Sequence, residues 1–303
     1  MSTTTNTRSV DRYVSRLGQE PGLTERLDPV VWGEAPGPLD PELLASYEDD
    51  GYLQITGLLA PEEVDALDRE IDRLVQDPEV RAAERTIIER GSDEVRSVFE
   101  VHHDGPFARL CRDPRLADVA RQLLGDDVYI HQSRINLKPG FRGKEFYWHS
   151  DFETWHTEDG MPSMRAVSCS VSLTENTHVN GPLMVIAGSH RWFASCAGET
   201  PPDHHRESLR RQEIGVPSDE QLSDLADRGR IVGLTGPPGS VTFFECNAMH
   251  GSNGNITPFP RRNAFFVFNS VSNALQQPFA APAPRPLHIA SRDFTPLPRP
   301  EAD

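Results

Sequence analysis

The spacing of hydrophobic positions predicts helices in the first part of the chain. Between residues 61 and 75, apolar side chains recur three or four positions apart, which is the period of an amphipathic helix. These positions are Val64, Leu67, Ile71 and Leu74. Acidic residues gather at the start of the segment, where they complement the helix dipole. Two further helices are predicted, one from Asp40 onward and one over residues 114–124, which ends before a glycine.

From residue 128 onward the pattern changes to the two-residue alternation of β-strands. Between Ala166 and Leu173, apolar residues alternate with serines, as expected for a strand with two different faces. Residues 128–138 are predicted to be extended, with polar side chains on one face. Those side chains are Gln132, Arg134 and Asn136. Further strands are predicted over residues 183–186, 231–234, 240–246 and 263–270. Helices followed by a run of strands predict one α+β domain, mainly β, built on a sandwich or barrel.

The two ends of the chain depart from this pattern. Residues 1–38 are polar and punctuated by proline and glycine, so we expect an N-terminal tail that wraps around the domain or frays. Residues 39–303 are expected to form a single domain. Its Pro-rich extension, from about residue 278, is expected to run over the surface. A charged segment over residues 198–230 contains one more predicted helix, near residues 218–226.

Composition excludes several classes of protein. The 303 residues carry 46 acidic and 30 basic side chains, so the formal net charge is −16, and the only lysines are Lys138 and Lys144. This acidity argues against a nucleic-acid or anionic-membrane partner, and no run of ~20 apolar residues could span a bilayer. The N-terminal sequence lacks the apolar segment of a secretory signal. The four cysteines form no CxxC pair, so we expect a cytoplasmic protein with reduced thiols.

The segment around residue 150 contains candidate metal ligands. His149 and Asp151 lie two positions apart, so on a strand both side chains would point to the same side. His250 follows the predicted strand 240–246 and supplies a third candidate ligand. Two histidines and one carboxylate are the ligand set of non-haem Fe(II) oxygenases, which leave coordination positions open. Zinc is also possible on ligand chemistry alone.

Arg261 favours iron over zinc. It follows His250 by eleven residues and opens the last predicted strand. In this class of oxygenases a basic residue at that spacing binds the distal carboxylate of 2-oxoglutarate, and the planar guanidinium pairs with a carboxylate through two hydrogen bonds. His156 and Asp159 are weaker ligand candidates, because a spacing of three does not place two side chains on one strand face.

A longer stretch around the candidate ligands resembles a known family. Residues 146–165, FYWHSDFETWHTEDGMPSMR, are similar to the signature of the ectoine hydroxylases, in the phytanoyl-CoA hydroxylase-like branch of the Fe(II)/2-oxoglutarate dioxygenases. The resemblance continues in residues 166–176, 180–184, 188–190 and 250–261. It spans at least residues 96–272. The chain departs from the sequence typical of the family at residues 177–179 and at Ala187, which lie outside the inferred ligand set.

The resemblance implies a fold, an assembly and a reaction. The fold is a double-stranded β-helix (jelly-roll, cupin-like) core flanked by helices, and the assembly is a homodimer. The reaction converts ectoine, 2-oxoglutarate and O2 to 5-hydroxyectoine, succinate and CO2 by ferryl-mediated C–H hydroxylation, in compatible-solute synthesis under osmotic stress. Two alternatives stay open. One is a related hydroxylase of another small amino acid such as proline, and the other is a non-catalytic β-barrel binding protein that retains a metal.

The resemblance also implies residue roles. Iron would be held by His149, Asp151 and His250. The cosubstrate 2-oxoglutarate would contact Arg261 and Ser252, in a pocket shaped by Ser168, Arg134, Asn136 and Phe99. Ectoine is a small zwitterion with a delocalised amidinium cation, so its pocket needs an aromatic wall and polar contacts. The candidates are Trp155, Phe244 and Phe265 for the wall and Gln132 for a polar contact.

Overall fold

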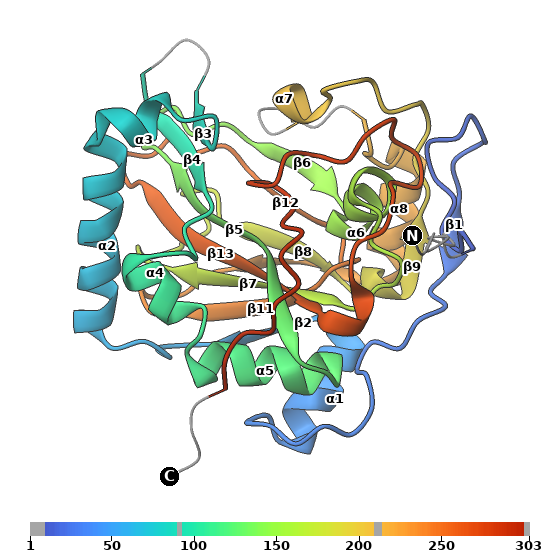
Figure 1. Cartoon of the computed structure of the whole chain (residues 1–303), viewed down its shortest axis with the longest axis horizontal. Helices are drawn as coiled ribbons and strands as arrows, with labels where there is room; N and C mark the ends of the chain where they lie inside the picture. Colours follow the sequence, from blue (N-terminus) through green and yellow to red (C-terminus); the bar gives the residue numbers. More distant parts are fainter. Residues whose placement is uncertain (1–9, 90–92, 209–213, 300–303) are drawn as a thin grey trace, which may run out of the picture.

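The computed structural model describes residues 10–89, 93–208 and 214–299, and its centre is formed by two antiparallel sheets (Figure 1). In spatial order, the larger sheet consists of β2 (Tyr52–Ile55), β11 (Val241–Glu245), β7 (Ala166–Ser172), β13 (Arg261–Ser270), β5 (Val128–Lys138), β4 (Val95–Phe99) and β3 (Thr86–Ile88). The smaller sheet consists of β10 (Arg230–Leu234), β8 (Leu183–Ala187), β12 (His250–Ser252) and β6 (Phe146–His149). A separate pair joins β1 (Leu23–Glu25) and β9 (Trp192–Ala194).

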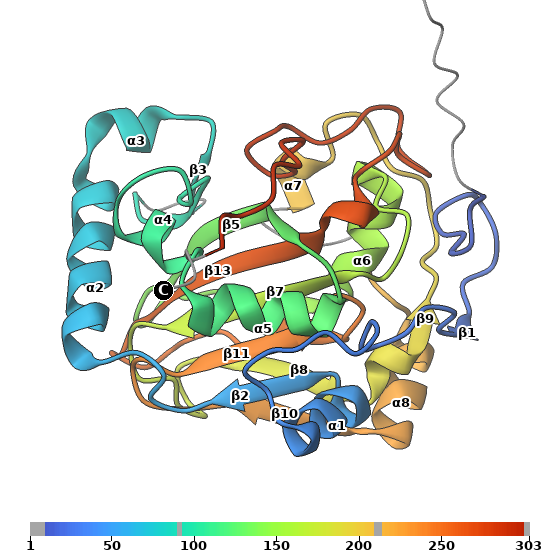
Figure 2. The ribbon, with the colours of Figure 1, turned by 60° about the horizontal axis from the view of Figure 1, so that its bottom comes forward.

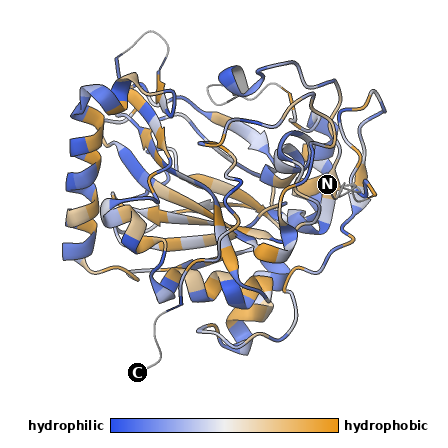
Figure 3. Ribbon diagram, in the orientation of Figure 1, coloured by the Kyte–Doolittle hydropathy of each residue, from blue (hydrophilic) through white to orange (hydrophobic). Residues whose placement is uncertain are grey.

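Helices surround the two sheets, and most of the longer ones lie on the outer face of the larger sheet. The longer ones are α1 (Pro41–Asp50), α2 (Pro61–Gln76), α5 (Pro114–Leu124) and α8 (Asp219–Arg228). The shorter ones are α3 (Pro78–Ala82), α4 (Gly105–Leu110), α6 (Asp151–Thr154) and α7 (His205–Ser208), and a π-helical turn (Trp155–Asp159) continues α6. Figure 2 shows α5 lying across β13, β7 and β11. Figure 3 shows that α2 turns hydrophilic residues outward and hydrophobic residues toward the sheet.

Local sequence explains where α5 begins and ends. The Asp113 side chain accepts a hydrogen bond from the backbone N–H of Arg115, and Pro114 occupies the first helical turn, where no donor is needed. Gly125 ends the helix in the left-handed conformation, with φ +60°. A Cβ at this position would lie 1.8 Å from the carbonyl oxygen of Trp32, so only glycine fits the approach of the N-terminal segment.

The two faces of β7 show how the barrel is built. Its apolar residues Val167, Cys169 and Val171 belong to the main hydrophobic core beneath α5. The alternating serines point between the sheets, where Ser168 donates to Asp151 and Ser170 accepts from an asparagine of β13. One apolar side of the larger sheet therefore faces the helices, while its other side places these serines between the sheets, next to a smaller apolar cluster that includes Phe244 and Phe265.

The predicted fold class is confirmed, and every helix and strand predicted above is present with small shifts in its bounds. The ends of the chain are packed more closely than expected. Tyr13 and Arg16 are buried, so the described part of the N-terminal segment wraps the domain and does not fray. Residues 1–9 and 300–303, at the ends of the two segments, lie outside the described residues.

The expectation that the Pro-rich extension runs over the surface is wrong for its middle part. Ile289 and Ala290 are buried, and the backbone N–H of Ser291 donates to the carbonyl of His131 in β5. Isolated apolar residues between prolines have no period, so burial of this kind is not visible in the sequence. Among the described helices, none has the length and apolar character that crossing a membrane requires.

Candidate metal centre and cosubstrate pocket

Three potential metal ligands meet between the two sheets. His149 ends β6, Asp151 begins α6 and His250 begins β12, and one ligand atom from each lies within 4.8 Å of the others. His149 and His250 are register partners on neighbouring strands, and their ring centroids are 4.2 Å apart. Across residues 10–89, 93–208 and 214–299, no other cluster of three His, Cys, Asp or Glu side chains has ligand geometry.

Hydrogen bonds orient both imidazoles for metal binding. The Nδ1 atoms of His149 and His250 lie 2.8 and 3.0 Å from the carbonyl oxygens of Tyr147 and Ala248. A proton on each Nδ1 leaves Nε2 as the free donor atom. The two Nε2 atoms lie 3.7 and 3.8 Å from the carboxylate oxygens of Asp151.

The electrostatics of the cluster suit a divalent cation. Burial and the neighbouring His250 lower the pKa of His149 to about 3, so this imidazole is neutral at physiological pH. Burial opposes ionisation of Asp151, but the two histidines, Arg134 and Ser168 together lower its pKa. Neutral imidazoles and an ionised carboxylate are the protonation states that metal binding requires. This donor set fits Fe(II).

The local structure that brings the ligands together differs from the predicted one. His149 and Asp151 do not share a strand face, because the strand ends at His149 and the chain turns into a helix. Ser150 caps that helix, and its hydroxyl donates to the side-chain oxygen of Asn247 at 3.0 Å. Ser168 of β7 donates to Asp151 at 3.2 Å. The carboxylate is therefore positioned by a helix start and a hydrogen bond.

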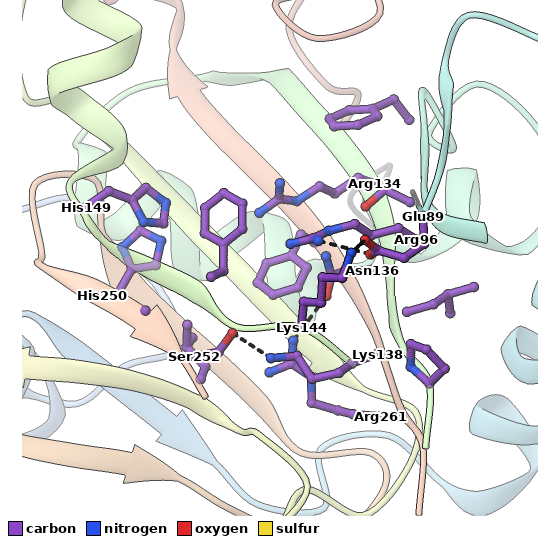
Figure 4. A pocket seen from close by; sticks show the side chains of 18 residues that line it. Glu89, Arg96, Arg134, Asn136, Lys138, Lys144, His149, His250, Ser252 and Arg261 are labelled. Carbon is purple, nitrogen blue, oxygen red and sulfur yellow. Dashed lines mark hydrogen bonds and ion pairs between the residues drawn. The ribbon is translucent and has the colours of Figure 1, made fainter. Parts of the chain in front are cut away.

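A basic pocket extends from the two histidines to Arg261 (Figure 4). Arg261 donates to the carbonyl of Gly181 at 2.6 Å and to the side-chain oxygen of Asn136 at 3.0 Å. Lys138 donates to the hydroxyl of Ser252 at 2.8 Å and to the carbonyl of Asn253. All four acceptors are uncharged. A buried guanidinium and a buried amine with only neutral partners favour binding of a carboxylate, which would supply the missing negative charge.

The pKa values of these cations reflect their burial. Burial and the nearby Arg134 lower the pKa of Arg261 to about 10. Burial and Arg261 lower the pKa of Lys138 to about 6. The sequence reasoning missed Lys138, although it continues the alternation of Gln132, Arg134 and Asn136 by one more step. The alternation of polar side chains along this strand could therefore have identified Lys138 as a pocket residue.

The remaining candidate residues divide into two groups. Arg134, Asn136, Ser252, Phe99 and Phe265 line the pocket. The Arg134 guanidinium lies 5.2 Å from the centre of the Phe265 ring, within the range of a cation–π contact.

The second group lies outside the lining of this pocket. The Phe244 ring lies 5.0 Å from the ring of His250. Gln132 donates to the carbonyl of Ile289 at 2.8 Å. Trp155 is buried in a separate apolar cluster, with its ring 5.1 Å from that of His131.

His156 and Asp159 belong to a different polar network. His156 lies within hydrogen-bonding distance of Asp11 and of the carbonyl of Met161. Asp159 forms a two-point ion pair with Arg285 at 2.8 and 2.5 Å. These partners satisfy both side chains, and neither joins the metal-ligand cluster.

Facing antiparallel sheets with a His–Asp–His cluster between them define a jelly-roll dioxygenase of the Fe(II)/2-oxoglutarate-dependent class. The family model of phytanoyl-CoA dioxygenase matches residues 47–263. The chain belongs to the phytanoyl-CoA dioxygenase family.

Relatives within this family are ectoine dioxygenases. The enzyme from Streptomyces anulatus is 56% identical over 297 residues, which cover 97% of this chain and 99% of the relative. The enzyme from Bordetella bronchiseptica is 55% identical, over 93% of this chain and 92% of the relative.

Comparison with solved structures leads to the same group of proteins. The crystal structure of EctD from S. alaskensis with bound Fe has a TM-score of 0.86 and 49% identity, over 96% of this chain and 98% of that chain. The structure of the same protein with 2-oxoglutarate and 5-hydroxyectoine has a TM-score of 0.84 and 51% identity, over 93% of this chain and 95% of that chain. The resemblance, the jelly-roll fold and the enzyme class expected from the sequence are confirmed.

Proposed function

We propose that this protein is an ectoine 5-hydroxylase, which converts ectoine, 2-oxoglutarate and O2 to 5-hydroxyectoine, succinate and CO2. The observation that carries the proposal is the cluster of His149, Asp151 and His250 beside a cationic pocket. The chain that contains it is 56% identical to an ectoine dioxygenase over 97% of its length.

His149, Asp151 and His250 would hold the iron. Bound Fe(II) supplies the activation of O2 that allows an unactivated C–H bond to be hydroxylated. The protein contributes ligand orientation, because carbonyl acceptors fix both imidazoles and the Ser168 hydroxyl holds Asp151. These contacts keep Nε2 of each histidine and the carboxylate directed at one point.

The cationic end of the pocket would bind the distal carboxylate of 2-oxoglutarate. Arg261, Lys138 and Ser252 converge there, in the same pocket as the two histidines (Figure 4). A carboxylate would give the Arg261 guanidinium, and the Lys138 amine once it is protonated, the charged partner that their present acceptors do not provide. Asn136 holds the Arg261 guanidinium in place, and Phe99 and Arg134 line the wall. The keto-acid end of 2-oxoglutarate then faces the metal ligands.

The ectoine subsite would adjoin the metal ligands. We assign Phe265, Phe244, Trp155 and Gln132 to it. An aromatic face attracts the amidinium cation of ectoine. Phe244 and Phe265 support the assignment, because one packs against His250 and the other lines the pocket.

We also propose a single catalytic domain from residue 39 onward, a homodimer and a cytoplasmic location. One main core joins the helices to the larger sheet, which supports a single domain. Cys111, Cys169, Cys196 and Cys246 are all buried free thiols, which suits a reducing compartment. Light scattering of the purified protein tests the assembly, because a dimer has twice the 33.8 kDa mass of the chain.

Succinate formation tests the activity. With Fe(II), 2-oxoglutarate and O2 present, we expect succinate to accumulate only slowly until ectoine is added, and 5-hydroxyectoine to appear with it. Asp151→Ala should abolish both the turnover and the binding of one equivalent of metal, because it removes an iron ligand. Turnover with proline in place of ectoine, or full activity of Asp151→Ala, would refute the proposal.

A further inference from the structure

Three charged side chains from separate segments meet over the cosubstrate pocket. Glu89 follows β3, Arg96 lies in β4 and Lys144 lies in the loop between β5 and β6. The Glu89 carboxylate lies 3.1 Å from Nη1 of Arg96 and 2.8 Å from Nζ of Lys144. All three side chains line the same pocket as Lys138 and Arg261 (Figure 4).

This cluster spans the pocket from solvent to the metal centre. The Lys144 side chain is 51% exposed and that of Glu89 only 12%. On the inner side, the Arg96 guanidinium lies 5.6 Å from the centre of the Phe146 ring. That ring in turn packs edge-on against His149, with centroids 4.8 Å apart. The Glu89–Lys144 pair is therefore the outermost link of a chain of contacts that crosses the pocket.

Glu89 and Lys144, the two partners of the outer ion pair, belong to different segments at the rim of the pocket. Glu89 is fixed to the β3–β4 hairpin, where Arg96 is its second partner. Lys144 is carried by the loop that joins β5 to β6, and Gly143 of that loop pairs with Asn255. The ion pair thus connects the edge of the larger sheet to the strand that carries His149.

We propose that the Glu89–Lys144 ion pair closes the cosubstrate end of the pocket, and so controls how long 2-oxoglutarate and succinate stay bound. The inference rests on the proposed function, because it takes the distal carboxylate to lie at Arg261 and Lys138. Burial opposes ionisation of Glu89, but Lys144 and Arg96 lower its pKa, so the carboxylate is charged when the pair is closed. A half-exposed ion pair is weak. It can open in every catalytic cycle.

Two variants separate closure from a simple effect of charge. Glu89→Gln removes a negative charge from the pocket, and Lys144→Met removes a positive one. If these residues acted only through the electrostatic field, the first variant would tighten binding of a dicarboxylate and the second would weaken it. If they form a closure, both variants break the same contact and both speed dissociation.

The measurement is ligand binding to the full-length protein loaded with Ni(II), without ectoine. Calorimetry gives the Kd of 2-oxoglutarate and of succinate, and stopped-flow tryptophan fluorescence gives the dissociation rates. We expect each variant to raise both dissociation rates about 2- to 5-fold, the range of a partly exposed ion pair. The double variant should release each ligand no faster than the faster of the two single variants does, because the contact can be lost only once.

The pair Glu70–Arg73 on α2 provides a matched control. It is a similarly exposed ion pair, with 2.7 Å between charged atoms, and neither residue lines the pocket. Glu70→Gln and Arg73→Met should leave both dissociation rates unchanged. Opposite shifts in Glu89→Gln and Lys144→Met, or rates equal to wild type, would overturn the closure.

The assay also distinguishes the two proposals. If 2-oxoglutarate binds and both pocket variants release it faster, the closure stands even if ectoine does not stimulate turnover. In that case only the assignment of ectoine fails. If the wild-type protein does not bind 2-oxoglutarate or succinate, the closure fails together with the cosubstrate site.

Discussion

Replacing Arg16 by methionine tests how far the N-terminal segment supports the metal site. The Arg16 side chain is fully buried and forms ion pairs with Glu153 and with Glu158, the latter at 2.5 Å. Both carboxylates belong to the helical turns that begin at Asp151. Arg16 therefore anchors the N-terminal segment to the segment that presents a metal ligand.

The expected destabilisation follows from the burial of all three charges. Removing one partner of a buried ion pair costs about 3–5 kcal/mol, because the remaining charge is left without compensation. In Arg16→Met two buried carboxylates lose their cation, so we expect the free energy of unfolding to fall by about 3–5 kcal/mol. The Tm should fall by roughly 5–15 °C. Metal affinity should fall as well, because Glu153 is two residues from Asp151.

Denaturant titration followed by tryptophan fluorescence measures the loss, and Arg12→Met is the matched control. Arg12 pairs with Asp28 at 2.8 Å, but its side chain is 41% exposed. Asp28 keeps hydrogen bonds from the Tyr13 hydroxyl and from the backbone N–H of Met164. The control should lose less than about 1 kcal/mol. Equal losses in the two variants would refute the anchoring role of Arg16.

Two further predictions concern the cationic end of the pocket. Arg261→Ala should raise the KM for 2-oxoglutarate at least ~10-fold, which is over ~1.4 kcal/mol for the lost charged pair, and an unchanged KM would place the distal carboxylate elsewhere. Burial and Arg261 lower the pKa of Lys138 to about 6, so above that pH the amine must take up a proton to pair with a bound carboxylate. The affinity for 2-oxoglutarate should therefore fall as pH rises from 6 to 8, by at most about tenfold per unit, and Lys138→Met should flatten the profile measured by calorimetry. A pH-independent affinity in the wild type would contradict the pairing.

Features with a short repeat could be predicted from the sequence. The period of α2 and the alternation of β7 each depend on neighbours a few residues apart, and both elements formed where expected. The metal ligands were predicted from their chemistry. The geometry given for them was wrong, because the two-residue spacing of His149 and Asp151 crosses the boundary between a strand and a helix.

Contacts between distant segments could not be predicted. Arg16 and Glu153 are separated by 137 positions, and nothing in the local pattern around either residue indicates a partner. The same holds for Arg285, which pairs with Asp159 across 126 positions. Such pairs depend on how the ends of the chain wrap the barrel, and a pattern of hydrophobic positions describes only which face of an element is buried.

The distribution of charge connects the surface of the protein to its chemistry. The chain has a net charge of −16, yet both of its lysines line the cosubstrate pocket together with Arg96, Arg134 and Arg261. Salt screens exposed charges over about 8 Å at physiological ionic strength but acts much less on buried ones. The excess of acidic residues favours hydration of the protein at high solute concentration, while the buried guanidinium of Arg261 retains its attraction for a dicarboxylate. We infer that this separation suits an enzyme that works at high salt, because its anion site is shielded from the surrounding ions; activity that fell steeply with moderate salt would count against the inference.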